Sequence, residues 1–163
     1  MKQYNILFLC THNSARSILG EALASTHLSG KLRGFSAGST PGTSVNPIAA
    51  DIAVELGMAR ALLKSKSWDV FGEPNAPKMD FIVTVCDNAA GEVCPFWPGN
   101  PVTAHWGFPD PSQVQGTDIE KRAAFYEVMN GLKKRIDILA EMPLDKLDSM
   151  SLKNIHTQIQ TAS

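Results

Sequence analysis

The fold of this chain is decided near its amino terminus, where YNILFLC at residues 4–10 is followed by THNSARS at residues 11–17. The first segment is a short apolar run of the kind that fills a buried parallel strand. The second is a polar loop, and from Ser17 onward apolar residues recur at helical spacing. A strand that leads through a short loop into a helix predicts the opening unit of an α/β fold.

Strands and helices alternate along most of the remaining chain. We expect further strands at residues 33–37, 78–86 and 102–106, and helices at residues 17–30, 47–57 and 118–142. Thr117 and Glu120 have the spacing of a capping box at the start of the last of these helices. The alternation predicts right-handed crossovers and a mostly parallel sheet that is covered on both faces.

The chain is expected to form one domain over residues 1–142, followed by a C-terminal extension over residues 143–163. A length of 163 residues is enough for one compact core and short for two. Because the extension is polar and only weakly periodic, we expect a short helix or a loose segment there.

The composition excludes several classes of protein. With 15 basic and 16 acidic residues the formal net charge is −1, which gives no sign of a nucleic-acid-binding surface. No stretch approaches the roughly 18 uninterrupted apolar residues of a membrane span, and the first residues lack signal-peptide features. We therefore expect a cytoplasmic protein without nucleic-acid or membrane partners. In that reducing compartment the three cysteines favour catalytic or redox use, although burial as small apolar side chains is the alternative.

The polar loop has the pattern of an oxyanion site, because Cys10 and Arg16 enclose five residues between a strand and a helix. Five intervening residues can curl so that successive backbone N–H groups point into one bowl at the positive end of the helix. Arg16 adds a planar fork that can hold two oxygens of a tetrahedral anion. The residues expected to bind the oxyanion are Thr11, His12, Asn13, Ser14, Ala15 and Arg16.

The same positive field favours the thiolate of Cys10, which makes it the candidate nucleophile. Cysteines in such settings drop from a pKa of about 8.5 to roughly 3.5–7.5. Ser17 can donate its hydroxyl to the sulfur, and Asn13 can brace the loop through its side-chain amide. His12 is expected to face outward, since an ionised nucleophile needs no base. The alternative, a buried cysteine with an unrelated surface arginine, is disfavoured by the placement between strand and helix.

Displacement at Cys10 expels an oxygen leaving group, which needs a proton. The best candidate for the acid is Asp110, in the segment WGFPDP at residues 106–111. It follows a predicted strand and is flanked by two prolines that stiffen the loop. An aspartate before a proline is also common in turns, so the assignment depends on its combination with the nucleophile loop.

These segments resemble the low-molecular-weight protein tyrosine phosphatases, and more closely the arsenate reductases built on the same fold. The similar segments are FLCTHNSARS at 8–17, FSAGS at 35–39, VTVCD at 83–87 with Cys94-Pro95, and HWG at 105–107 with Asp110-Pro111. The resemblance covers residues 1 to about 142. It implies a single-domain, flavodoxin-like α/β fold with a four-stranded parallel sheet flanked by helices.

The resemblance also implies the reduction of arsenate to arsenite for arsenic detoxification. Cys10 attacks arsenate, for which phosphate or sulfate are mimics, and Asp110 protonates the departing oxygen. Cys86 then attacks the Cys10 sulfur, arsenite leaves, and Cys94 takes over to give a Cys86–Cys94 disulfide. An external thiol system, thioredoxin or glutathione with glutaredoxin, is the implied reductant and transient partner, and no bound cofactor is implied.

Departures from the family pattern bear on the reductant. Ala15 stands where many relatives carry a further cysteine, so a thiol there is dispensable. Seven residues separate Cys86 from Cys94, one more than in thioredoxin-linked members, and this leaves glutathione with glutaredoxin open as the donor.

A further departure concerns a potassium ion that some relatives hold near the nucleophile loop. Asn13, Glu21 and Ser36 match residues around that ion, but the segment at residues 65–68 lacks the expected carboxylate. We expect the Lys66 ammonium to take the place of the ion, and therefore no metal.

Two other functions remain possible on the sequence. A tyrosine or small-molecule phosphatase would use the same nucleophile and acid and would finish with water. Phosphatases of this type place tyrosines directly after the Asp-Pro pair, where this chain has Ser112-Gln113, and they need no second thiol. A non-catalytic oxyanion-binding module is disfavoured by the intact set of Cys10, Arg16, Ser17 and Asp110.

Overall fold

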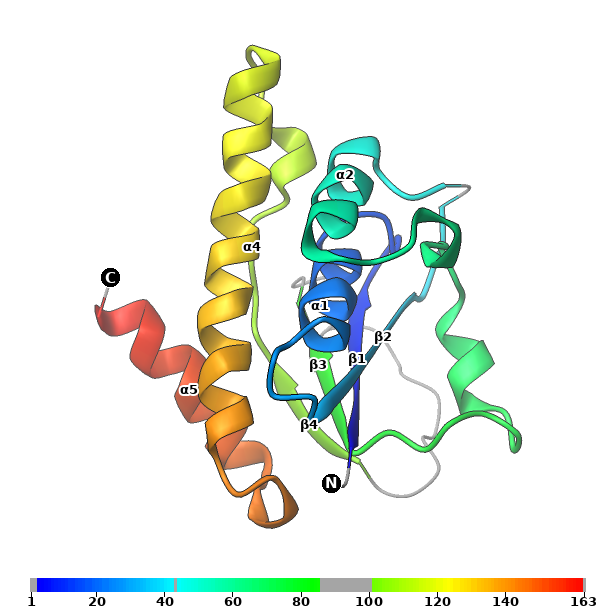
Figure 1. Ribbon diagram of the computed structural model, residues 1–163, viewed down its shortest axis with the longest axis vertical. Coiled ribbons are helices and arrows are strands. Elements are labelled where there is room, and N and C mark those ends of the chain that lie inside the picture. Colours follow the sequence, from blue (N-terminus) through cyan, green and yellow to red (C-terminus); the bar gives the residue numbers. More distant parts are fainter. Residues whose placement is uncertain (1–2, 43, 86–100, 163) are drawn as a thin grey trace.

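The computed structural model describes residues 3–42, 44–85 and 101–162. Its centre is a parallel sheet with the strand order β2-β1-β3-β4 (Figure 1). The strands are β1 (Tyr4–Cys10), β2 (Leu32–Gly38), β3 (Phe81–Thr84) and β4 (Val102–His105). This order is the flavodoxin-like one, and the predicted four-stranded parallel sheet is confirmed. β3 is shorter than expected from the apolar run, which begins in an irregular segment before Phe81.

Helices cover one face of the sheet: α1 (Arg16–Ser25), α2 (Pro47–Leu56), α4 (Asp118–Glu141) and α5 (Ser149–Ala162). The predicted capping box of α4 is present, because Thr117 and Glu120 each accept a hydrogen bond from the backbone of the other. α1 ends at Ser25, five residues before the expected stop at Gly30. The chain then turns, and Gly30 supplies a positive φ of 67° within that turn.

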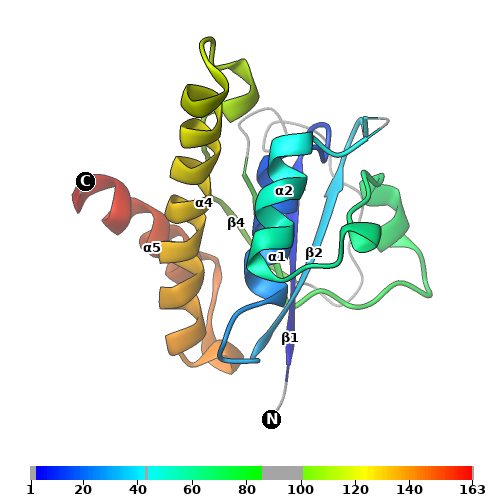
Figure 2. The ribbon, with the colours of Figure 1, turned by 45° about the horizontal axis from the view of Figure 1, so that its top comes forward.

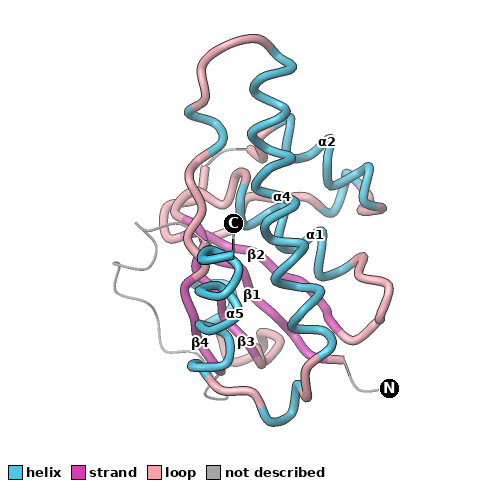
Figure 3. The backbone as a smooth tube through the Cα atoms, turned by 90° about the vertical axis from the view of Figure 1, so that its left-hand side faces the viewer, coloured by secondary structure: helices cyan, strands magenta, loops and turns pink. Residues whose placement is uncertain are grey.

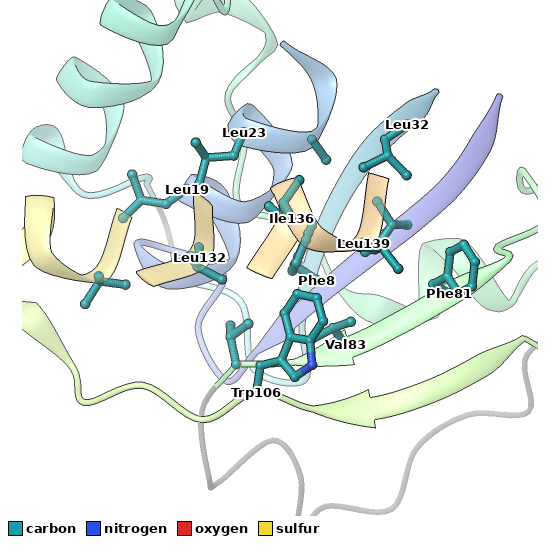
Figure 4. Packing of buried hydrophobic residues seen from close by; sticks show 14 of the residues in the cluster. Phe8, Leu19, Leu23, Leu32, Phe81, Val83, Trp106, Leu132, Ile136 and Leu139 are labelled. Carbon is teal, nitrogen blue, oxygen red and sulfur yellow. The ribbon is translucent and has the colours of Figure 1, made fainter. Parts of the chain in front are cut away.

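The alternation of side chains along β1 divides the core into two clusters. Ile6, Phe8 and Cys10 face the helices, whereas Leu7 and Leu9 face the opposite side. On the helical face, apolar residues of α1 and α4 meet those of the strands (Figure 4). Cys10, the last residue of β1, is only 4% exposed, so the strand delivers it directly into this packed interior.

The opposite face is covered by a segment that the sequence pattern does not predict. It contains two short 3₁₀ turns, η1 (Arg60–Leu62) and η2 (Trp68–Gly72). Trp68 and Phe71 of η2 pack against the far side of the sheet, and the ring of Phe71 meets that of Phe35 edge-on at 5.7 Å. In the described residues this face therefore carries short turns in place of an α-helix.

The C-terminal extension folds as the helix α5, so of the two expected forms the helix is the observed one. It lies beside β4 and the carboxyl-terminal half of α4 (Figures 2 and 3). Leu152 and Ile155 are buried, and the indole nitrogen of Trp106 donates a 2.9 Å hydrogen bond to the Leu152 carbonyl. None of the helices in the described part of the chain is both long and apolar enough to cross a membrane.

Candidate active site

The anion loop, residues 11–16, connects the end of β1 to the start of α1. Three of its carbonyl groups accept hydrogen bonds from a neighbouring segment: Thr11 from Thr40 N, His12 from Gly42 N and Ser14 from Asn46 N, at 2.8–3.0 Å. Because these carbonyls are bonded to the neighbouring segment, the N–H groups of residues 12–15 in the loop are left for another partner.

Those N–H groups have the properties of an anion site. The hydrogen bonds of the described residues include none donated by the backbone N–H groups of residues 12–15. The N-cap of α1, Ala15, offers no side-chain hydrogen bond. Uncapped N–H groups at the positive end of a helix favour a bound anion.

Asn13 fixes the shape of the loop from inside. Its φ of 50° lies in the left-handed region, which asparagine tolerates better than most residues. The fully buried side chain accepts a 2.7 Å hydrogen bond from the backbone N–H of Lys66 and donates a 2.9 Å bond to Ser17 Oγ. This is the bracing that the sequence predicts for Asn13. The loop also packs so closely on Gly38 that a Cβ there would lie 2.5 Å from the Thr11 carbonyl oxygen.

Arg16 lies in the first turn of α1, and residues of the segment after β4 contact its two terminal nitrogens. Its Nη1 donates a 2.8 Å hydrogen bond to the carbonyl of Phe108, and its Nη2 lies 3.7 Å from Asp110 Oδ2. Its Nε is buried and has no hydrogen-bond partner among the residues that the structure describes. A buried N–H donor left unsatisfied costs about 1–3 kcal/mol, so this donor favours a further acceptor.

Asp110 stands beside Arg16 at the start of the short turn η3 (Pro111–Gln113). Its Oδ1 accepts hydrogen bonds from the Ser112 amide and hydroxyl, at 2.9 and 2.7 Å. Burial acts to raise the pKa of Asp110, but the Ser112 hydrogen bonds and the charge of Arg16 bring it below its usual value. Asp110 is therefore a carboxylate at neutral pH.

A partly buried ion pair joins α1 to the segment that carries Lys66. Glu21 of α1 accepts a hydrogen bond from the Ser36 hydroxyl, and its Oε1 lies 3.7 Å from Lys66 Nζ. Burial raises the pKa of Glu21 and lowers the pKa of Lys66, while the attraction between the two charges opposes both shifts. The ammonium of Lys66 thus lies beside Glu21, and its replacement of a metal ion stays a prediction. The described residues contain no group of three or more His, Cys, Asp or Glu side chains that could hold a metal.

The comparisons with known proteins agree with this geometry. Residues 5–151 match the family described as low molecular weight phosphotyrosine protein phosphatase. The chain belongs to this family. One relative of this phosphatase-family chain, the arsenate reductase of Halalkalibacterium halodurans, is 38% identical over 141 residues, which make up 86% of this chain and 98% of the relative.

Solved structures of the phosphatase family show the same arrangement. An arsenate reductase in the phosphate binding state has a TM-score of 0.62 and 26% identity, over 86% of this chain and 97% of that one. A thioredoxin-dependent arsenate reductase of Corynebacterium glutamicum has a TM-score of 0.57 and 23% identity, over 85% of this chain and 60% of that one. At that identity, the second likeness shows the fold alone.

The structure brings together some of the site residues that the sequence predicts for this family member. Cys10, Arg16, Ser17 and Asp110 lie at the carboxyl-terminal edge of the sheet, and the His12 side chain is exposed, as expected. The predictions for Cys86 and Cys94 fall outside the described residues.

Sequence reasoning missed Phe108, whose carbonyl anchors Arg16. A backbone acceptor leaves no signature in residue type, so no sequence signal could have identified it. The Lys66 backbone N–H, which holds Asn13, was missed for the same reason.

Proposed function

We propose that this chain reduces arsenate to arsenite in the cytoplasm, as part of arsenic detoxification, with external thiols as the reductant. The observation that carries the proposal is the buried Nε of Arg16, without an acceptor in the described residues, beside the uncapped start of α1 and next to Cys10. An arginine fork and a ring of N–H groups together match a tetrahedral oxyanion. The arsenate reductases among the relatives support arsenate as that anion.

Cys10 is the proposed nucleophile, and its surroundings favour the thiolate. The positive end of α1 and the guanidinium of Arg16 both stabilise a negative sulfur. Ser17 Oγ accepts from Asn13, which leaves the Ser17 hydroxyl hydrogen for donation to the Cys10 sulfur.

In the first step the Cys10 thiolate attacks arsenic. A sulfur–arsenic bond forms, an arsenic–oxygen bond breaks, and the departing oxygen leaves as water. Asp110 delivers the proton. Although it is ionised at rest, a bound oxyanion adds negative charge beside it and competes for Arg16, and both effects raise the pKa of Asp110.

In the second step the Cys86 thiolate attacks the Cys10 sulfur. A disulfide forms, the sulfur–arsenic bond breaks, and its electron pair stays on arsenic, which is thereby reduced from As(V) to As(III) and leaves as arsenite. Cys94 then attacks Cys86, and an external dithiol returns two electrons and two protons. Thioredoxin is one candidate donor, and glutathione with glutaredoxin is the other.

Mass spectrometry of the reduced protein after exposure to arsenate, with no external thiol, tests the proposal. One equivalent of arsenate is expected to yield one equivalent of arsenite and one disulfide, Cys10–Cys86 or Cys86–Cys94. Phosphate at the same concentration is the control and leaves all thiols reduced. A protein that stays fully reduced after arsenate would contradict the proposal.

A phosphomonoester phosphatase is the second candidate, and the contact between Arg16 and Asp110 favours it equally. Phosphate and arsenate have the same shape, so the first half of the reaction is shared. The two differ in the second half, where water replaces Cys86. Hydrolysis of an aryl phosphate without any disulfide in the arsenate experiment would support the phosphatase.

Asp110→Asn is expected to lower the rate of arsenate reduction in a single turnover by about 10²- to 10⁴-fold, the usual contribution of a general acid. Asparagine can still accept the hydrogen bond from the Ser112 amide, so the turn keeps its shape. Rapid-quench measurement of arsenite release checks this. The matched control is Ser112→Ala, which removes the hydroxyl hydrogen bond to Asp110 and keeps both the amide hydrogen bond and the acid. Equal rates for Asp110→Asn and the wild type would exclude the acid role.

A further inference from the structure

The backbone carbonyl of Phe108 orients the guanidinium of Arg16. The contacts that hold Phe108 in place therefore also set the direction of this guanidinium. Among the described residues, the 2.8 Å bond from Nη1 to the Phe108 carbonyl is the only hydrogen bond of this guanidinium, and Nη2 and Nε are left for other partners. The Phe108 backbone is tied to the residue after β3 through a 3.0 Å bond from its N–H to the Val85 carbonyl. Its ring contacts Arg135 of α4 and His156 of α5.

The ring of Phe108 packs against the guanidinium of Arg135, a residue of α4. The Arg135 guanidinium carbon lies 4.7 Å from the ring centroid, within the range of a cation–π contact. Gly131, one turn earlier, makes room for the ring, since a Cβ there would lie 2.7 Å from Phe108 Cε1. A glycine inside a helix lowers stability by about 1 kcal/mol relative to alanine. The close approach of Phe108 explains why glycine is present at position 131.

Arg135 itself is buried, with 4% exposure, and pairs with no carboxylate in the described residues. Its charge is met by neutral acceptors: Nη1 donates to the Gly131 carbonyl at 2.7 Å, and Nε donates to His156 Nδ1 at 2.9 Å. Because arginine has only donors, His156 Nδ1 must be unprotonated. Burial and the nearby charges of Arg135 and His105 lower the pKa of His156 to about 4, so the acceptor persists at neutral pH.

We propose that Arg135, fixed by His156 of α5, is a positioning residue that holds Phe108 and thereby aims the Arg16 fork at the bound oxyanion. This inference rests on the proposed function, because it assumes that Arg16 binds the anion. His156 lies beyond residue 151, where the match to the family ends. The path from the C-terminal helix to the anion site thus runs through four residues: the side chains of His156 and Arg135, the ring and backbone carbonyl of Phe108, and the guanidinium of Arg16.

The test compares two substitutions of one residue. His156→Leu removes the acceptor and keeps the bulk, whereas His156→Asn keeps an acceptor near the position of Nδ1. The affinity of the reduced protein for inorganic phosphate is measured by calorimetry, together with the midpoint of thermal unfolding, Tm. His156→Leu is expected to raise the phosphate Kd about tenfold, equivalent to ~1.4 kcal/mol, and His156→Asn by no more than about twofold.

Two further variants separate positioning from stability. Leu152→Ala removes a buried side chain of α5 without touching Arg135, and it should lower Tm while leaving the phosphate Kd unchanged. Gly131→Ala should raise the Kd by displacing Phe108, although alanine favours the helix. If His156→Leu does not fold, the phosphate Kd of Gly131→Ala tests the proposal in its place.

The outcomes are distinct. If the wild type binds no phosphate, the proposed function fails and the inference fails with it. If the wild type binds phosphate and the Kd of His156→Leu or Gly131→Ala equals the wild-type value, only the inference fails. A rise in Kd that follows the fall in Tm in every variant, Leu152→Ala included, also overturns it.

Discussion

Cys10→Ser is expected to abolish the turnover of arsenate and of any aryl phosphate, by a factor of at least about 10⁴, as loss of an essential nucleophile does in comparable enzymes. A serine hydroxyl in the same place is not ionised by the positive end of α1, whereas a thiol with a lowered pKa is. The measurement is the rate of arsenite formation with excess thiol donor, and in parallel the rate of aryl phosphate hydrolysis.

The anion loop itself should survive this substitution. Cys10 is buried at the end of β1, and serine differs from it by one atom, so the fold has little to rearrange. The phosphate affinity of Cys10→Ser should stay within a few-fold of the wild type, which separates loss of the nucleophile from loss of the site. Arsenate turnover that persists in Cys10→Ser would remove the assignment of the nucleophile.

Cys86→Ser is expected to stop arsenate reduction with every thiol donor while sparing aryl phosphate hydrolysis. The substitution leaves the attack by Cys10 untouched and removes the sulfur that must displace arsenite. The arsenic should accordingly stay bound to Cys10, visible as an adduct in native mass spectrometry. Steady-state assays with the thioredoxin system and with glutathione and glutaredoxin, run side by side, measure the loss.

Cys94→Ser is the matched control, because it removes a thiol from the same segment. Full loss of activity with thioredoxin would identify Cys94 as the third thiol, and unchanged activity with glutathione would identify the other donor. Normal arsenate reduction by Cys86→Ser with any donor would refute the thiol mechanism in the form proposed here.

The sheet and the anion loop could be predicted because their signals are local. The apolar run at residues 4–10 is long enough to identify a buried strand, and the spacing of Cys10 and Arg16 identifies the loop. The ends of α2 and the start of α4 follow from caps that act within one turn. In α2, the Asn46 side chain accepts hydrogen bonds from the first backbone N–H groups, and Gly57 ends the helix with a φ of 116°.

The contacts that orient the site could not be predicted, because they join residues distant in sequence or use backbone atoms. Arg16 and the Phe108 carbonyl are 92 residues apart, and Asn13 meets the Lys66 N–H across 53 residues. The only sequence signal for Lys66 is the absence of the expected carboxylate from residues 65–68. The turn at Trp68–Gly72 has neither period that identifies helices or strands.

The burial of Trp106 has a consequence for how the molecule is divided. Its indole is fully enclosed, and its one N–H is satisfied by the backbone of α5. A protein shortened to the span shared with its relatives would uncover a large aromatic ring at the outermost strand and strand its polar hydrogen. The final helix therefore belongs to the packed core, and its removal should lower the free energy of unfolding.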